Sequence, residues 1–303
     1  MLNRLLIVTI IGGLIPFGGE FWWVLELFSH FRLQYVALAL LLLLAAVGGR
    51  RYRLALLLAV TAGINLWPAL PYLPSAKPPL TGGSFTLLNL NVNASNPERE
   101  RILALLSATE ADIVTLIELS PELAALLPTL ASRYPYQIAE PAAGNFGLGV
   151  LSRYPLLAAN AFELGPTTAI EAGVALPEGE LRLLAVHPVP PISAAMAATR
   201  NQQLSQLAVR ARQADEPLLI CGDFNLSPYS PYFQRFLIES ATTDTRRGLG
   251  IGFSWPTFLP LLGVPIDHCF TRGALIATGV ERMDPIGSDH YPVHLTLRWL
   301  DNQ

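Results

Sequence analysis

The sequence is poor in charged residues, and in lysine above all. Charged residues make up only 14% of the 303 residues, and Lys77 is the single lysine. From residue 75 onward, 15 Lys and Arg stand against 21 Asp and Glu, a net charge near −6. Proteins that grip duplex DNA usually carry a basic patch that displaces counterions. This composition therefore disfavours duplex DNA as a substrate, although it does not exclude nucleic acid altogether.

Cysteine is also scarce, with Cys221 and Cys269 as the only two. Two cysteines without a CxxC pattern exclude a cysteine-based zinc site. Both lie in predicted buried strands, where free cysteine behaves as a small apolar residue. A disulfide between them would be permitted outside the cytoplasm. The sequence favours free thiols and leaves the pairing open.

Apolar residues, by contrast, are abundant before residue 75. They reach 51% of the chain, and the mean hydropathy is +0.40. Three apolar blocks cover residues 5–19, 35–49 and 54–73, and a membrane span takes ~20 residues. The alternatives are buried core helices, or a cleaved signal peptide for the first block. We predict three transmembrane helices within a membrane anchor at residues 1–74.

Positive charges set the expected orientation of this anchor. Arg4 precedes the first block, and Arg50, Arg51 and Arg53 lie between the second and third. Basic loops stay in the cytoplasm, so three crossings would place the rest of the chain on the other side. We therefore expect a multi-pass protein of the cell (inner) membrane with an extracytoplasmic, periplasmic main domain.

The pattern changes after a proline-rich linker at residues 75–84, which we expect to be extended. The domain at residues 85–303 alternates predicted strands and helices, which indicates a single α/β domain with packed sheets. The predicted strands are 85–92, 112–117, 147–151, 181–186, 264–270 and 293–299, and the predicted helices are 98–108, 121–132 and 194–212.

One stretch, residues 217–228, joins a buried strand to exposed polar side chains. Four apolar residues lead to Gly222, and Asp223 and Asn225 follow two positions apart, which puts them on one side of an extended chain. A carboxylate and an amide suit Mg²⁺ and a phosphoryl oxygen. An Asx turn is the alternative interpretation, since Asp, Asn and Ser favour turns.

The residues Gly222-Asp-Phe-Asn225 resemble the GDFN signature of the endonuclease/exonuclease/phosphatase superfamily. These are magnesium-dependent phosphoesterases related to pancreatic deoxyribonuclease and neutral sphingomyelinase. The resemblance runs from about Phe85 to Trp299 with its motifs in family order. It implies a four-layer α/β/β/α sandwich of two β-sheets flanked by helices, with Mg²⁺ as the cofactor and Mn²⁺ as a substitute.

The resemblance assigns three residues to the metal. Asn91 matches the asparagine at the end of the first strand, and Glu118 matches the metal-binding glutamate of the next. Asp289 would be a second metal-side carboxylate. The strand 85–92 contains asparagines among leucines, against strand propensity, which indicates a cost accepted for function. The alternative interpretations are that Asn91 only stabilises a hydrogen-bonded turn and that Glu118 only marks the point where the strand reaches solvent.

The catalytic assignments are His187, Asp223, Asn225, Asp267 and His290. His187 follows a strand, as in members that resemble deoxyribonuclease I and the sphingomyelinases, where it protonates the leaving oxygen or stabilises the transition state. A satisfied core histidine is the alternative. His290, in Gly287-Ser-Asp-His-Tyr, would be the general base, with Asp267 orienting its ring.

Asn145, Arg153, Ser254 and Trp255 lie in segments that also resemble the family, and we expect them to face the substrate. The sequence thus predicts a membrane-anchored Mg²⁺-dependent phosphoesterase whose substrate is a lipid headgroup, a small molecule or a nucleic acid. A nuclease of the same fold is the alternative, and a non-catalytic membrane module is a third hypothesis. Membrane lipid is the other expected partner, and nothing in the sequence indicates a protein partner.

Overall fold

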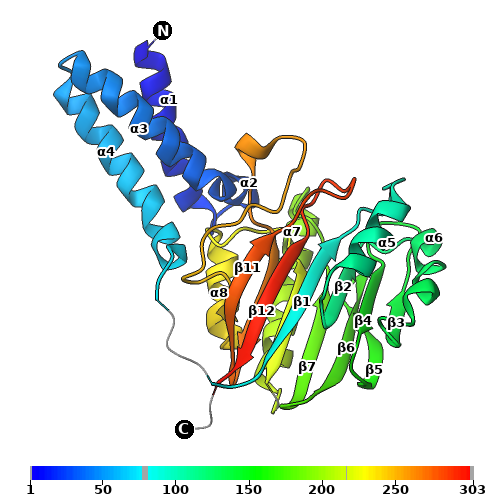
Figure 1. Cartoon of the computed structure of the whole chain (residues 1–303). Coiled ribbons are helices and arrows are strands. Elements are labelled where there is room, and N and C mark those ends of the chain that lie inside the picture. The colour runs from blue at the N-terminus through cyan, green and yellow to red at the C-terminus, as the bar shows by residue number, and fades with distance from the viewer. Residues whose placement is uncertain (1, 77–80, 216, 301–303) are drawn as a thin grey trace. The chain divides into compact units, whose positions relative to one another are not determined.

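The chain forms two compact units in the computed structural model, which describes residues 2–76, 81–215 and 217–300 (Figure 1). The first unit comprises Met1–Leu73 and Leu226–Arg235, and the second comprises Pro74–Asn225 and Phe236–Gln303. Residues 77–80 of the predicted linker lie outside the described residues.

Four helices and three short 3₁₀ turns make up most of the first unit. They are α1 (Leu2–Leu14), η1 (Ile15–Gly18), α2 (Trp23–Leu27), η2 (Phe28–Phe31), α3 (Arg32–Gly48), α4 (Tyr52–Leu66) and η3 (Trp67–Tyr72). Small and branched residues such as Leu6, Ala39 and Leu58 pack α1, α3 and α4 together. Large apolar side chains point outward, with Leu41 66% and Leu44 72% exposed. Helices that are apolar on every face suit a lipid environment.

Two helical stretches in the described residues are long and apolar enough to cross a membrane, where the sequence predicted three. They are Trp23–Gly48, with 26 residues, and Tyr52–Tyr72, with 21. The first apolar block yields a helix over Arg4–Gly18 only, shorter than the ~20 residues of a span. Pro16 lacks the N–H that would continue the α-helix, and a 3₁₀ turn replaces it there. The prediction of three spans is therefore wrong for this block.

The second unit is a sandwich of two six-stranded sheets. The first sheet has the order β11-β12-β1-β2-β4-β3 and the second has the order β5-β6-β7-β8-β10-β9. The strands are β1 (Ser84–Asn91), β2 (Ile113–Ile117), β3 (Tyr136–Glu140), β4 (Leu148–Ser152), β5 (Leu156–Leu164), β6 (Thr167–Leu176), β7 (Gly179–Val186), β8 (Leu218–Asp223), β9 (Thr243–Asp244), β10 (Asp267–Arg272), β11 (Leu275–Arg282) and β12 (Val293–Trp299). The predicted two-sheet α/β sandwich is confirmed.

Both faces of the central strands are covered, which explains their nearly continuous apolar sequences. In β1, Phe85 and Leu87 enter the core between the sheets, whereas Leu88 and Leu90 pack in a second core with α5 (Arg99–Ala108) and α6 (Pro121–Ala124). The chain also contains the helices α7 (Ala194–Arg212) and α8 (Pro231–Ser240). Asn89 and Asn91 share the odd face of β1 and therefore point toward the other sheet.

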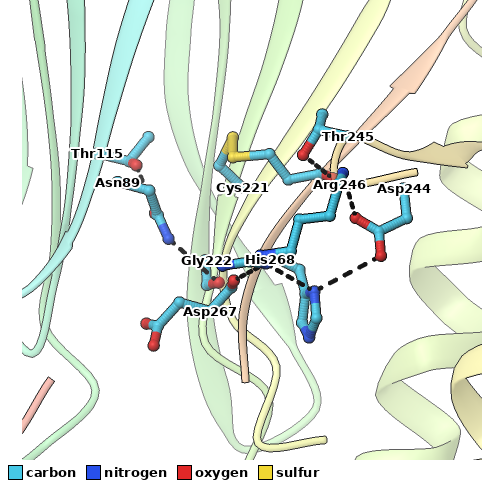
Figure 2. Close-up of a disulfide and its surroundings, with 10 residues drawn as sticks. Asn89, Thr115, Cys221, Gly222, Asp244, Thr245, Arg246, Asp267 and His268 are labelled. Atoms are coloured by element: carbon cyan, nitrogen blue, oxygen red, sulfur yellow. Dashed lines mark hydrogen bonds and ion pairs between the residues drawn. A yellow bond between two sulfur atoms is a disulfide. The ribbon is translucent and has the colours of Figure 1, made fainter. Parts of the chain in front are cut away.

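A disulfide joins Cys221 and Cys269, so the expectation of free thiols is wrong (Figure 2). The two cysteines are directly opposite each other on the antiparallel strands β8 and β10. Both belong to the core between the sheets. The sequence placed each of them in a buried strand but could not show that the two strands are neighbours.

We expect the disulfide to contribute substantially to stability, because it closes a loop with a sequence separation of 48. Loop-closure entropy for such a loop corresponds to about 2–4 kcal/mol. The double variant Cys221→Ala/Cys269→Ala should lower the free energy of unfolding by that amount in chemical denaturation. Mass spectrometry after thiol alkylation, without reductant, should show no labelled cysteine in the unfolded wild type. Two alkylated cysteines there would contradict the disulfide.

Candidate active site

The sheet registers bring the ends of five strands together. In the first sheet, parallel β1 and β2 pair Asn91 with Ile117, so Glu118 comes one residue beyond. In the second sheet, β7 and β8 are also parallel and pair Val186 with Gly222. His187 and Asp223 are the next residues of these two strands. The carboxyl ends of parallel strands meet at one edge of a sheet, where ligands bind in α/β folds.

The first residue of β10 completes this edge. Asp267 pairs directly with Asp223 across the antiparallel strands β8 and β10. Ser254 fixes it there, because its hydroxyl accepts hydrogen bonds from the backbone N–H groups of Ile266 and Asp267, at 3.1 Å each. Two carboxylates therefore face each other in a buried position.

Asn91 connects the two sheets within this site. Its Nδ2 donates hydrogen bonds to Glu118 Oε1 and to Asp223 Oδ2, each at 3.1 Å. Glu118, His187 and Asp223 each offer a ligand atom within 4.8 Å of the others. The structure thus gathers the predicted residues Asn91, Glu118, His187 and Asp223 into one buried cluster.

A second group shares Asp223 with the first. His290 Nδ1 lies 2.8 Å from Asp267 Oδ2, and His290 Nε2 lies 3.6 Å from Asp223 Oδ2. Ser288 holds the loop that carries His290: its hydroxyl donates to the Asn91 carbonyl and accepts from the His290 N–H. The predicted pair of Asp267 and His290 is therefore in direct contact.

The hydrogen bonds of His187 determine its tautomer. Its Nδ1 lies 2.8 Å from the backbone carbonyl of Asn145, and a carbonyl can only accept, so Nδ1 carries the proton. Nε2 is then the acceptor for Asn225 Nδ2 at 3.3 Å. Burial lowers the pKa of His187, against the opposing effect of Glu118. The ring is therefore neutral and presents an acceptor toward Asn225.

Three residues around the site have positive φ although none is glycine: Glu118 (62°), Asn225 (52°) and Asn93 (57°). Asparagine tolerates the left-handed region because its side chain can form local hydrogen bonds, and here Asn93 Oδ1 accepts from the Ser95 N–H at 2.9 Å. Glutamate has no such advantage, and this conformation costs a residue of its type about 1–3 kcal/mol. Strained backbone of this kind clusters at functional sites, so the positive φ makes Glu118 a candidate functional residue.

The electrostatics of the cluster favour protons or a cation. Burial, reinforced by the neighbouring Asp267, raises the pKa of Asp223 to about 7. Burial also raises the pKa of Glu118, although His187 and Asn91 oppose it. Burial disfavours the charged ring of His290, but Asp267 and Asp223 outweigh it and raise its pKa to about 10. The carboxylates thus create a negative potential that the protonated ring of His290 offsets only in part.

The four predicted substrate-facing residues and Asp289 have different outcomes. Asp289 accepts from Asn93 Nδ2 at 2.7 Å and from Trp255 Nε1 at 3.0 Å, and so belongs to the rim of the site. Asn145 contacts the site through its backbone carbonyl, which accepts from His187 Nδ1, and the residue itself is exposed. Ser254 is buried and bonds backbone N–H groups, so the prediction that it faces the substrate is wrong.

Arg153 is also a correction. It follows Ser152, which pairs with Ile113 at the start of β2, whereas Glu118 follows the end of that strand. The antiparallel register therefore places Arg153 at the far end of the sheet, where its side chain forms an ion pair with Asp112 at 3.1 Å. The motif that contains it resembled the family, but the strand direction carries it away from the site.

Sequence reasoning missed the support behind the site (Figure 2). Asn89 Nδ2 donates to the Gly222 carbonyl, and its Oδ1 accepts from the Thr115 hydroxyl. This contact ties the first sheet to the residue before Asp223. The run of asparagines in β1 was the available signal, because a buried amide in a strand needs partners.

A buried polar group also backs Asp267 (Figure 2). The Arg246 guanidinium donates to the Asp267 carbonyl and to His268 Nδ1, and the Arg246 N–H donates to Asp244. Arginine has no acceptor, so His268 Nδ1 accepts, and its Nε2 donates to the Pro265 carbonyl. His268 is thus a neutral supporting residue.

Comparison with known proteins identifies the family of this chain. The sequence model of the Endonuclease/Exonuclease/phosphatase family covers residues 88–290. Proteins of this family are phosphoester hydrolases. The chain belongs to the Endonuclease/Exonuclease/phosphatase family. No curated protein sequence matches the chain.

Solved structures share the fold at low identity. A humanized TDP2 of D. rerio is 19% identical with a TM-score of 0.60, covering 71% of this chain and 99% of that one. A family protein of Beutenbergia cavernae is 23% identical with a TM-score of 0.59, covering 72% of each chain. Beta toxin of Staphylococcus aureus is 16% identical with a TM-score of 0.55, covering 70% of this chain and 99% of that one.

The charge of Asp267 should control the basicity of His290. Asp267→Asn removes the larger of the carboxylate effects and should lower the pKa of His290 from about 10 toward its ordinary value. Asp289→Asn, which removes a smaller effect, is the matched control. The titration is followed by NMR of ¹⁵N-labelled imidazole in EDTA. An unchanged pKa in Asp267→Asn would show that this carboxylate does not set it.

Proposed function

We propose that the chain is a membrane-anchored, divalent-metal-dependent phosphoesterase that hydrolyses its substrate with water. The observation that carries this proposal is the shared position of Asp223. Its carboxylate belongs both to the group with Glu118 and His187 and to the group with Asp267 and His290. A cation-binding function and a proton-accepting function would therefore meet at one carboxylate.

The residues at this position fit a hard cation. Glu118 and Asp223 supply carboxylate oxygens whose raised pKa values reflect uncompensated burial. Asn91 now directs Nδ2 at both carboxylates, and a half-turn of its amide would present the oxygen instead. Mg²⁺ prefers such oxygen donors and retains positions for water and phosphate. When bound, it would polarise the phosphoryl group and stabilise the charge of the transition state.

His290 supplies the base in this proposal. Its Nδ1 is engaged by Asp267, so Nε2 is the nitrogen that accepts a proton from water. Asp267 stabilises the imidazolium that results. A base must begin deprotonated, and its pKa of about 10 applies with both carboxylates uncompensated. A cation on the Asp223 side would reduce that basicity and bring the ring closer to the neutral range.

Asn225 and His187 complete the proposed site on the opposite side. The amide Nδ2 of Asn225 currently donates to the Pro188 carbonyl at 3.0 Å and lies near His187 Nε2. An amide N–H in this position suits a phosphoryl oxygen. His187 is neutral, with its proton on Nδ1, so its Nε2 has no proton for a leaving oxygen and instead helps to orient the Asn225 amide.

The N-terminal unit would anchor the enzyme through the stretches Trp23–Gly48 and Tyr52–Tyr72. The loop between them carries Arg50 and Arg51, with Arg53 just beyond, and the positive-inside rule keeps such a loop in the cytoplasm. Two crossings then place the second unit outside, as the three-span interpretation did, but Arg4 would share that side. A disulfide between Cys221 and Cys269 supports an oxidising compartment.

The chemical class of the substrate is a phosphate ester, and a nuclease is the alternative. A D. rerio TDP2 structure is described with a single-strand DNA product, at 17% identity to this chain. The net charge near −6 after residue 75 speaks against a phosphate backbone as the ligand. A lipid headgroup or a small phosphodiester meets less repulsion.

Activity should require Mg²⁺ and the His290 pair. Full-length protein in detergent micelles should hydrolyse bis-nitrophenyl phosphate, and EDTA should abolish the activity. His290→Ala should lower turnover by ~10²–10⁴-fold, and Asp267→Asn should be impaired as well. Their losses should combine sub-additively, because the two residues act as one unit.

His294→Ala is the control for this series, because His294 lies in β12 and lines a surface hollow with Glu110 and Glu281, which do not belong to the cluster. Its turnover should match that of the wild type. Phosphatidylcholine vesicles, single-stranded DNA and duplex DNA tested alongside separate lipid from nucleic-acid substrates. Fully additive losses for Asp267 and His290 would show that the two residues act independently. Hydrolysis that does not depend on Mg²⁺ would refute the role of the metal.

The orientation has a direct test in cells. An alkaline phosphatase that is active only outside the cytoplasm should be active when fused after residue 303. The same enzyme inserted after Gly49 should be silent, because that loop is expected in the cytoplasm. Green fluorescent protein at the two positions should give the reverse pattern. If the phosphatase at the C-terminus is silent and green fluorescent protein at the same position is fluorescent, the orientation is the reverse of the one proposed.

A further inference from the structure

The segment Leu226–Arg235 begins at the residue after Asn225, yet it packs with the N-terminal helices in the first unit. The residues 226–230 of this segment are all buried. The chain therefore passes from the candidate active site directly into the membrane unit. The hydrogen bonds of this segment with the N-terminal helices determine how firmly the segment is fixed.

Ser230 makes one of the polar contacts that hold it. The Ser230 hydroxyl donates to Glu26 Oε1 at 2.7 Å and accepts from the Tyr232 N–H at 3.2 Å. Ser230 precedes α8 (Pro231–Ser240), so this is the position of a helix N-cap, followed by the proline that favours the first turn. Both Glu26 and Ser230 are fully buried. The same hydroxyl thus starts a helix and partners a buried carboxylate.

Ser227 makes a further polar contact. The Ser227 N–H donates to His30 Nδ1 at 3.2 Å, and the Ser227 hydroxyl lies 2.9 Å from the same nitrogen. A backbone N–H can only donate, so Nδ1 is an acceptor and the ring is the Nε2–H tautomer. The hydroxyl must then donate to Nδ1 as well. His30 therefore recognises both the backbone and the side chain of Ser227.

Both partners lie at the start of the Trp23–Gly48 stretch. Its 26 residues exceed the ~20 that cross a bilayer, which leaves about the first six outside the hydrocarbon. Glu26 falls within that excess and His30 comes one turn later. A buried carboxylate without a hydrogen-bond partner is strongly disfavoured. The contacts with Ser227 and Ser230 are therefore specific docking contacts rather than incidental ones.

We propose that Glu26 and His30 are positioning residues for the candidate active site. They hold Leu226–Arg235, and the peptide bond between Asn225 and Leu226 transmits that constraint to the turn of Asp223 and Asn225. This proposal rests on the proposed function. The membrane unit is then part of the catalytic machinery, and it does more than tether the enzyme.

The test compares full-length variants in detergent micelles, with turnover measured against Mg²⁺ concentration on bis-nitrophenyl phosphate. Glu26→Leu removes the acceptor for Ser230 and should lower kcat at saturating Mg²⁺ at least tenfold per folded molecule. Glu26→Gln keeps a carbonyl oxygen and should lose less. Glu20→Leu, an exposed glutamate of the same region, is the matched control and should behave as the wild type. The losses of Ser230→Ala and Glu26→Leu should combine sub-additively, because both remove the hydrogen bond between these two side chains, although Ser230→Ala also removes the acceptor for the Tyr232 N–H.

Hydrogen exchange of the peptide 223–235 provides a readout that does not depend on activity. Glu26→Leu and the milder Ser227→Ala should each accelerate exchange there relative to Glu20→Leu. Equal kcat and equal exchange in Glu26→Leu and Glu20→Leu would overturn the positioning role. A wild type that hydrolyses nothing with Mg²⁺ would sink the proposed function instead, and exchange would still decide whether Glu26 and His30 hold the segment.

Discussion

The burial of Asp223 among other acidic groups is the constraint on which the site depends. Its carboxylate is buried, pairs in register with Asp267, and lies within reach of Glu118. Burial strips this carboxylate of hydration and Asp267 repels it, which is why the pKa of Asp223 rises to about 7. Asn91 and His290 offset part of this cost through hydrogen bonds and positive charge. The remainder is what a divalent cation would offset.

The fold holds these groups together through its strongest elements. Asp223, Asp267 and Glu118 lie at strand ends, and the core between the two sheets fixes those strands. The disulfide on β8 and β10 lies two residues from each of the paired aspartates, at Cys221 and Cys269. The site is therefore unfavourable electrostatically and rigid mechanically. Such a stored cost is common where activity competes with stability.

Strand patterns and motif order predicted the sandwich and many of the residues that the structure gathers into the buried cluster. Local patterns could do this because each residue follows a strand whose apolar periodicity is clear. They failed where the answer depends on pairing between distant segments. The antiparallel direction of β4 places Arg153 at the far end of the sheet. The pairing of β8 with β10 brings Cys221 opposite Cys269. The Ser254 hydroxyl is occupied by hydrogen bonds from backbone N–H groups. The packing of Leu226–Arg235 with the N-terminal helices was equally invisible.

The response of thermal stability to pH and Mg²⁺ tests the central claim most directly. The folded pKa values of Asp223 and His290, about 7 and about 10, are raised, so both groups stabilise the metal-free protein at low pH. That stability is lost as pH rises from about 4 to 7 for Asp223 and from about 6.5 to 10 for His290. In EDTA, Tm should therefore fall from pH 5 to pH 8. Millimolar Mg²⁺ should raise Tm more at pH 8 than at pH 5, and Asp223→Asn should remove this difference. An equal Mg²⁺ effect at both pH values, or one that survives in Asp223→Asn, would contradict a cation site at Asp223.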